Sequence, residues 1–343
     1  MAGRKRDPYV DMGGALALKG AFRMASNGRA CCTPTSARKN PEAGADGLPR
    51  RLAGAGSHPI EQAAIPAGSF VMGEGTDIAN RRDGEHLTHA VYLDAFVIDA
   101  TTVTNRDFAR FVDATGYRTE AERWGVSAVF RHQVQAPRED VLGALDGMAW
   151  WVAVRGAHWR APGGALSTVD DLLDHPVVHV SWRDAVAYCQ WAGRGLPSEA
   201  QWEYASRGGL AGCRYPWGDD VTDDCGTWRC NIWQGDFPHT NLIEDGWRLT
   251  APVEAFPPNG YGLYQTVGNV WEWCGDGFDP DYYARSPLSN PPGPADVARR
   301  VMRGGSFLCH DSYCNRYRNA ARTSNTPAAS SSNVGFRTIG PGA

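Results

Sequence analysis

Residues 259–273 read NGYGLYQTVGNVWEW, and they show how the second half of the chain is built. Glycine and asparagine recur every few residues and separate short apolar or aromatic runs by tight turns. Beyond Gly208 no stretch keeps a helical period for long. The pattern predicts an α+β fold that is poor in regular secondary structure, with short strands and long ordered loops. Long ordered loops need additional stabilising contacts, which bound metal ions or dense aromatic packing would provide.

Three helices are predicted before residue 208, and all three begin with the same chemistry. Thr104, Ser181 and Ser198 each place a hydroxyl before an apolar periodic segment, and an acid or amide follows three residues later. This arrangement lets two side chains satisfy the first free backbone N–H groups of a helix. Gly116 and Gly193 fit the C-terminal ends of the first two helices.

Short strands are predicted from alternating or β-branched residues. One follows a turn within residues 65–73, and a second covers residues 89–99. Residues 175–180 also read as a strand, on which His175 and His179 would share a face. A ligand pair is one interpretation of these histidines, and two ordinary histidines on a half-buried strand are the other.

Residues 1–57 differ in composition from the rest of the chain. They carry 10 Lys and Arg against 4 Asp and Glu, whereas the remainder carries 24 against 34. They are rich in Gly, Ala, Arg, Ser and Pro without a sustained period, which predicts a disordered tail. Acidic residues and a proline follow the basic residues 4–6, so a secretory signal is not expected and the protein is predicted to be cytoplasmic. Residues 58–340 contain no linker-like stretch and are predicted to form one compact domain.

Composition excludes several classes of function. The three lysines are residues 5, 19 and 39, so the predicted domain offers no lysine for a Schiff base, a P-loop or a kinase site. The formal net charge of -4 argues against a nucleic-acid partner. No run approaches the ~18 apolar residues that cross a bilayer, so no membrane association is expected.

Nine cysteines are present, an odd number that does not favour a disulfide framework. Cys189 and Cys274 lie in apolar surroundings and are expected in the core. Cys225 and Cys230 have a spacing that suits a disulfide or a site.

The pair Cys309 and Cys314 stands apart, because it follows the glycine turn of residues 303–307 (RGGSF). Two thiols five residues apart are compatible with a structural disulfide, a redox dithiol or a two-thiolate metal site. No second pair with zinc-finger spacing accompanies them. Among first-row ions, Cu(I) is the one that prefers soft thiolates.

Oxygen-bearing side chains gather in two glycine-rich segments, residues 231–246 and 265–272. Carboxylates, amides and backbone carbonyls are the ligands that Ca²⁺ prefers. The spacing of an EF-hand is absent. Asparagine and aspartate that cap loops give the alternative interpretation.

Several segments together resemble the sulfatase-modifying factor family, and within it the formylglycine-generating enzymes. The general frame is carried by residues 65–73, 103–111, 179–191, 196–209, 259–273 and 303–337. The stretches specific to the enzymes are residues 231–238, 244–246, 309–318, 325–327 and 333–337. The resemblance covers nearly all of residues 58–340. It implies a fold related to C-type lectin-like domains.

The resemblance also implies an activity and a set of site residues. Such enzymes use O₂ to oxidise the cysteine of a Cys-x-Pro-x-Arg segment, in an unfolded sulfatase chain, to Cα-formylglycine. Cys309 and Cys314 would hold Cu(I), and the thiol of the substrate would join them before hydrogen is abstracted from its Cβ. Polar and aromatic side chains that would line this site are Ser306, Tyr313, Asn333 and Trp271. The protein is expected to act as a monomer.

Two structural calcium sites are implied as well. The first would be formed by Asn231, Ile232, Asp245 and Trp247. The second would be formed by Gln265, Gly268, Val270 and Glu272, with Gln265 where the family usually has asparagine. Asn319 and Thr338 stand where vertebrate members place cysteines, so the chain resembles bacterial members.

Two other functions are alternatives for a chain of this kind. A sulfoxide synthase of the ergothioneine type needs a three-histidine iron site and an additional helical domain, for which this chain lacks the length. A silent binding module would be expected to lack the cysteine pair, which is complete here.

Overall fold

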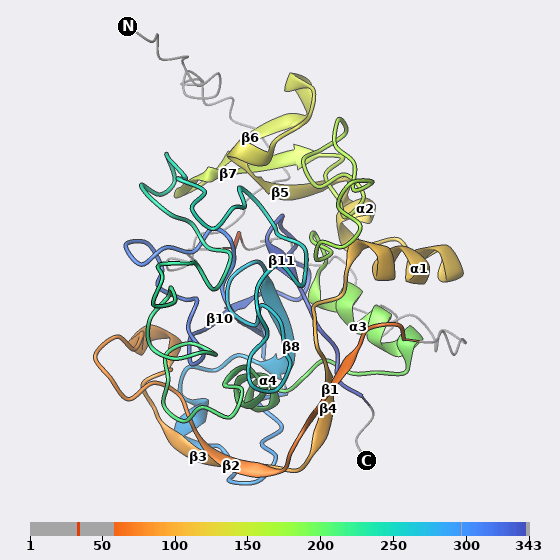
Figure 1. Ribbon diagram of the computed structural model, residues 1–343. Helices are drawn as coiled ribbons and strands as arrows, with labels where there is room; N and C mark the ends of the chain where they lie inside the picture. The colour runs from red at the N-terminus through yellow and green to blue at the C-terminus, as the bar shows by residue number, and fades with distance from the viewer. Residues whose placement is uncertain (1–32, 35–57, 296, 341–343) are drawn as a thin grey trace, which may run out of the picture.

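Residues 33–34, 58–295 and 297–340 are described by the computed structural model (Figure 1). The helices are few and short: α1 (Asn105–Thr115), α2 (Glu120–Trp124), α3 (Trp182–Ala192), α4 (Glu199–Ser206) and the 3₁₀ turns η1 (Arg81–Asp83), η2 (Arg131–Gln133), η3 (Arg138–Asp140) and η4 (Tyr282–Arg285). The strands are β1 (Gln62–Ile65), β2 (Gly68–Met72), β3 (His89–Leu93), β4 (Phe96–Asp99), β5 (Val126–Phe130), β6 (Val141–Leu145), β7 (Met148–Arg155), β8 (Trp271–Gly277), β9 (Arg300–Arg303), β10 (Arg322–Asn325) and β11 (Val334–Gly335). Long connections between these short elements confirm the predicted α+β fold.

The described strands form several small sheets rather than one large one. β1 pairs with β4, β2 pairs with β3, and β5, β7 and β6 form a three-stranded sheet. The fourth sheet has the order β10-β9-β8-β11, in which only β11 runs parallel to its neighbour β8. In Figure 1 this sheet lies between the β5-β7-β6 sheet above it and the β2–β3 ribbon below it.

The three predicted helices have the predicted starts. Thr104, Ser181 and Ser198 each accept a hydrogen bond from the third helical N–H, and each capping box is complete. Gly116 and Gly193 adopt the left-handed conformation with φ of 65° and 67° at the C-terminal ends. Local chemistry alone therefore fixes where these helices begin and where the first two end.

The strand predictions need two corrections. Residues 89–99 form β3 and β4 with a break at residues 94–95, because each half pairs with a different partner strand. Residues 175–180 do not form a strand, and His179 has a positive φ of 59°. The N–H of Val177 donates to the carbonyl of Val103, whereas the N–H of His179 donates to the carbonyl of Ser331. Because these two acceptors lie in different segments, the backbone bends between them.

The largest core cluster lies between α1, α3 and one face of the β8-β9 pair. It buries aromatic rings from both helices and from β8, including Phe108, Tyr188, Trp271 and Trp273. Cys309 belongs to the same cluster. The sheet and helices thus bring the cysteine loop against a rigid aromatic wall.

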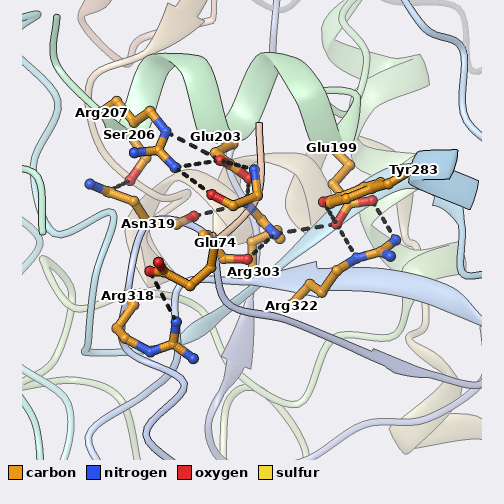
Figure 2. Close-up of polar contacts among 12 residues, drawn as sticks. Glu74, Glu199, Glu203, Ser206, Arg207, Tyr283, Arg303, Arg318, Asn319 and Arg322 are labelled. Carbon is orange, nitrogen blue, oxygen red and sulfur yellow. Dashed lines mark hydrogen bonds and ion pairs between the residues drawn. The ribbon is translucent and has the colours of Figure 1, made fainter. Parts of the chain in front are cut away.

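On the α4 side, a buried network of arginines and carboxylates holds the sheet to α4 (Figure 2). Arg303, the last residue of β9, is fully buried and pairs with Glu203 and with Glu199 Oε1 at 3.3 Å. Arg322 of β10 makes a two-pronged contact with Glu199, with both distances 2.7 Å. Bidentate arginine–carboxylate pairs fix orientation as well as distance.

Arg303 also binds the backbone beyond the cysteine loop. Its guanidinium donates to the carbonyl of Asn319 at 2.8 Å and to that of Ala320 at 3.1 Å. Because Arg303 precedes the loop and Asn319 follows it, one side chain ties the two ends of residues 304–318 together. Ser206 of α4 reinforces the tie by donating to Asn319 Oδ1 at 2.9 Å.

Two arginines keep Glu203 charged in this dry setting. Burial by itself raises the pKa of Glu203, but the nearby charges of Arg207 and Arg303 outweigh it and hold the pKa below its ordinary value. Among the residues that the structure describes, no helix is long and apolar enough to span a membrane.

Replacing Glu203 by glutamine would leave Arg303 and Arg207 as incompletely paired buried charges. We expect the Glu203→Gln variant to lose about 3–5 kcal/mol of unfolding free energy, measured by urea denaturation at pH 7. The exposed Glu139→Gln variant is the matched control and should stay within about 0.5 kcal/mol of the parent protein. Equal stabilities for the two variants would contradict the structural role of the network.

Candidate functional site

Two glycines turn the chain sharply at the end of β9. Gly304 and Gly305 have φ values of 93° and 77°, in the region that favours glycine. A Cβ at Gly304 would lie 2.7 Å from the carbonyl oxygen of Thr266, and one at Gly305 would lie 2.9 Å from that of Arg316. The predicted tight turn is therefore present, and close packing of the backbone on both sides requires it.

Cys309 is held in place through its backbone and its sulfur. Its N–H donates to the carbonyl of Ser306 at 2.8 Å, and its carbonyl accepts from the N–H of Trp233 at 3.0 Å. The N–H of Ser306 points at Cys309 Sγ, with a separation of 3.4 Å. The side chain is fully buried, so its sulfur lies in a fixed, dry position.

Cys314 follows one tight turn later and is partly exposed. The carbonyl of His310 accepts the N–H groups of Tyr313, Cys314 and Asn315, at 3.1, 3.0 and 3.1 Å. None of the described cysteines is in a disulfide, and this includes the pairs 309/314 and 225/230. One thiol of the loop thus faces the core while the other is accessible from outside.

A chain of polar side chains runs from Cys309 toward β11. Ser306 Oγ accepts from Asn333 Nδ2 at 3.0 Å and from the N–H of Leu308 at 3.4 Å. Asn333 Oδ1 in turn accepts from Ser331 Oγ at 2.8 Å. Ser306 and Asn333, which the sequence placed in one site, are in direct contact.

Aromatic rings pack against the loop that carries Cys309 and Cys314. Tyr313 stacks on Phe237 with 4.4 Å between ring centroids and meets the edge of Trp150 at 5.2 Å. Trp271 is fully buried in the cluster that contains Cys309, and its indole N–H has no hydrogen-bond partner among the described residues. Sequence reasoning missed Trp150, because its position within β7 reveals nothing about a loop 160 residues away.

The two histidines at 175 and 179 do not form a pair. His175 Nδ1 contacts Thr250 Oγ1 at 3.0 Å, whereas His179 is fully buried between Ser127 Oγ at 2.8 Å and the carbonyl of Pro162 at 2.9 Å. Burial lowers the pKa of His179 to about 3, so its ring is neutral. Its role is to join β5 to the segment before α3.

The first predicted calcium set is brought together. The N–H groups of Ile232 and Trp247 donate to the carboxylate of Asp245 at 3.1 and 2.8 Å. Burial raises the pKa of Asp245. Asn231 Oδ1 is buried with no hydrogen-bond partner among the described residues. A half-buried carboxylate bound to the N–H of Ile232, and an amide oxygen without a partner on the preceding residue Asn231, fit a calcium ion.

The second set fits calcium less well. Gln265 Oε1 is another buried oxygen without a partner in the described part of the chain. Glu272, however, already accepts from Arg337 at 2.7 and 2.8 Å and from Trp202 Nε1 at 2.8 Å. Gly268 has a φ of 81° and approaches the backbone of Asn231, where a Cβ would lie 2.5 Å from its carbonyl oxygen. Both of its neighbours in the set, Val270 and Glu272, are buried.

Within the described ranges, no three side chains among His, Cys, Asp and Glu form a group that could hold a metal. The three candidate sites above rely instead on a pair of thiols, or on a single carboxylate together with amide and carbonyl oxygens.

A family model described as the sulfatase-modifying factor enzyme 1-like domain matches residues 54–340. The chain belongs to this family. A relative from Streptomyces coelicolor, called formylglycine-generating enzyme, is 60% identical over 80% of this chain and 88% of its own length. A relative of the same name from Bos taurus is 51% identical over 82% of this chain and 75% of its own length.

The sulfatase-modifying factor family also includes members described as inactive. One of them, the inactive C-alpha-formylglycine-generating enzyme 2 of Bos taurus, is 43% identical over 81% of this chain and 87% of its own length. Among solved structures, PvdO from Pseudomonas aeruginosa has a TM-score of 0.61 at 22% identity, and covers 84% of this chain and 96% of its own. That likeness shows a shared fold.

Burial of His179 makes the free energy of unfolding fall as the pH is lowered. The unfolded chain binds a proton at His179 below about pH 6.5, whereas the folded protein resists it down to about pH 3. The stability that His179 contributes is therefore complete above pH 6.5 and is lost as the pH falls, by up to ~1.4 kcal/mol per unit. Urea denaturation of His179→Asn from pH 7 to pH 4 should show a shallower slope than the parent. The exposed His239→Asn variant should retain the parent slope.

Proposed function

We propose that this protein oxidises a cysteine in a sulfatase chain to Cα-formylglycine. The observation that carries the proposal is the pair of thiols, Cys309 and Cys314, on a loop fixed at both ends. The pair lies in a chain that is 60% identical to a relative called formylglycine-generating enzyme. The substrate would be an unfolded sulfatase segment with the motif Cys-x-Pro-x-Arg, and the oxidant would be O₂. We infer that the protein acts as a monomer in the cytoplasm.

Cys309 and Cys314 would hold Cu(I), because thiolates select this soft ion. When bound, the copper would supply the redox chemistry that joins O₂ to the oxidation of the substrate thiol. The protein's own contribution is geometric. Cys309 is fixed from the core side, and Cys314 is accessible, so a substrate cysteine can approach only from the side of Cys314.

Ser306 would orient a reacting oxygen. Its Oγ already accepts from Asn333 and from the N–H of Leu308, so its own O–H remains as a donor. Asn333 fixes the position of that hydroxyl, which is a positioning role. Tyr313, held between Phe237 and Trp150, together with Trp271 would exclude water from the buried thiol of Cys309.

The pair of thiols is tested by replacing each with serine. Conversion of a Cys-x-Pro-x-Arg peptide to the aldehyde, followed by mass spectrometry in air with Cu(I), should be abolished in Cys309→Ser and in Cys314→Ser. The fold should survive both changes, because no disulfide is lost. Cys225→Ser, at an exposed position, is the control and should convert the peptide at the parent rate.

Three outcomes would count against the proposal. No conversion by the parent protein, despite bound copper, would move the substrate to another class. No conversion and no copper binding would favour a silent binding module. Loss of folded structure in Cys314→Ser would point to a structural disulfide.

We also propose that Asn231, Ile232, Asp245 and Trp247 hold a structural calcium ion. Added calcium should raise the melting temperature of protein treated with chelator, because a ligand of the folded state stabilises it. Asp245→Asn removes the charged oxygen and should abolish this shift. Asp146→Asn, at an exposed position, should preserve it. A calcium shift that Asp245→Asn leaves intact would refute this site.

A further inference from the structure

The cysteine loop makes one turn between its two thiols. The carbonyl of His310 accepts the N–H groups of Tyr313 and Cys314 at 3.1 and 3.0 Å, which is the hydrogen-bond pattern of a single helical turn. Asn315 ends this turn in the left-handed conformation, with a φ of 46°. Side chains three residues apart on a helical turn lie on the same side, with about 5–6 Å between their Cβ atoms. Asp311 and Cys314 are such a pair, so the side chain of Asp311 leaves the loop beside the accessible thiol.

The carboxylate of Asp311 is exposed, and the loop uses only one of its oxygens. The side chain as a whole is 72% exposed. Asp311 Oδ1 accepts from the N–H of Ser312 at 2.5 Å and lies 3.1 Å from His310 Nδ1. Asp311 Oδ2 has no partner among the residues that the structure describes. The carboxylate is thus anchored through one oxygen and offers the other to a molecule that approaches from outside.

The two arginines of the cysteine loop are turned inward and are already paired. Arg316 donates from Nε to the carboxylate of Asp83 at 2.6 Å, and its side chain is 9% exposed. Arg318 donates to the carboxylate of Glu85 at 2.7 Å, and its side chain is 1% exposed. Both guanidinium charges are therefore compensated inside the protein. Residues 304–318 contain a single acidic residue, the exposed aspartate beside the accessible thiol, so the outer face of the loop favours a cation.

The proposed substrate motif carries such a cation. In Cys-x-Pro-x-Arg the proline is the second of the last four residues, and proline at that position favours a β-turn. A β-turn brings its first and fourth residues within ~7 Å of each other at Cα. The arginine therefore returns toward the residue that follows the substrate cysteine. With the substrate thiol beside Cys314, the arginine comes within reach of Asp311, where a guanidinium and a carboxylate form charge-assisted hydrogen bonds.

We propose that Asp311 binds the arginine of the substrate motif and so selects a cation at the fourth position after the substrate cysteine. The inference rests on the proposed function, because it assigns one position of that substrate to one side chain of this protein. Asp311 acts in recognition, and the oxidation is left to the site formed by Cys309 and Cys314. A substrate without the arginine therefore binds less tightly but reacts at the same rate when it saturates the protein.

The test measures binding without turnover, by fluorescence anisotropy of a labelled Cys-Thr-Pro-Ser-Arg peptide with the copper-loaded full chain under argon. The parent should bind this peptide about 5-fold more tightly than the same peptide with glutamine in place of arginine, which is the upper end for an exposed ion pair. Asp311→Asn should lose this preference, and its Kd for the glutamine peptide should equal that of the parent. Asparagine keeps an oxygen for the N–H of Ser312, so the turn is preserved.

Asp236→Asn is the matched control, because Asp236 is also exposed and directly precedes Phe237, whose ring stacks on Tyr313. This variant should retain the preference of the parent for the arginine peptide. For the parent, the preference should shrink when NaCl is raised from about 0.05 M to about 0.5 M, since salt screens an exposed ion pair. A preference that survives in Asp311→Asn, or that is lost only in Asp236→Asn, would overturn the proposal.

Exchange of the charges gives a second form of the test. Asp311→Arg should bind a peptide with glutamate in place of arginine more tightly than the arginine peptide, which reverses the order of the parent. In air with Cu(I), Asp311→Asn should raise KM for the arginine peptide and leave the rate at saturating peptide unchanged. Equal KM values for the arginine and glutamine peptides, in a parent protein that converts both, would refute the role of Asp311 and leave the proposed function standing. No binding and no conversion of any peptide by the parent would refute the proposed function itself.

Discussion

The buried ion pair between Arg303 and Glu203 is the constraint on which the rest of the structure depends. Arg303 ends β9, reaches back to α4 through Glu203 and Glu199, and binds the carbonyls of Asn319 and Ala320 beyond the cysteine loop. A guanidinium buried without these partners would be strongly destabilising. The charge therefore forces β9, α4 and the far end of the loop into a single arrangement.

The same logic recurs where regular secondary structure is sparse. Arg322 donates two hydrogen bonds to the carboxylate of Glu199. Arg337 donates two hydrogen bonds to the carboxylate of Glu272, and it also donates to the carbonyls of Asp99 and Ala100. Each buried arginine connects segments far apart in the sequence. Arginine suits this task because its donors are rigidly spaced and it stays charged when buried. Buried arginine contacts thus hold distant segments together where long β-sheets are absent. The cysteine loop is rigid because such contacts fix both of its ends.

Much of the candidate site could be foreseen, and the exceptions have physical causes. The turn at Gly304 and Gly305 follows from a motif that is short in sequence. The contact of Ser306 with Asn333 and that of Ile232 with Asp245 were expected only from the resemblance to the family. Trp150 and the Glu272–Arg337 pair were not foreseen, because their partners lie many residues away. The strand expected at residues 175–180 was wrong, because Val103 and Ser331 bind its backbone from different directions.

The sequence by itself determined the helix starts at Thr104, Ser181 and Ser198, the absence of a domain lysine and the presence of two thiols five residues apart. These depend on local hydrogen bonding or on composition, so no distant partner can alter them. Only the tertiary structure decided that Cys309 is buried while Cys314 is accessible, that Glu272 is already paired, and that Thr33 and Pro34 lie against Asn325. Each of those facts is a contact between segments that folding alone brings together, and such contacts leave no periodic trace in the sequence.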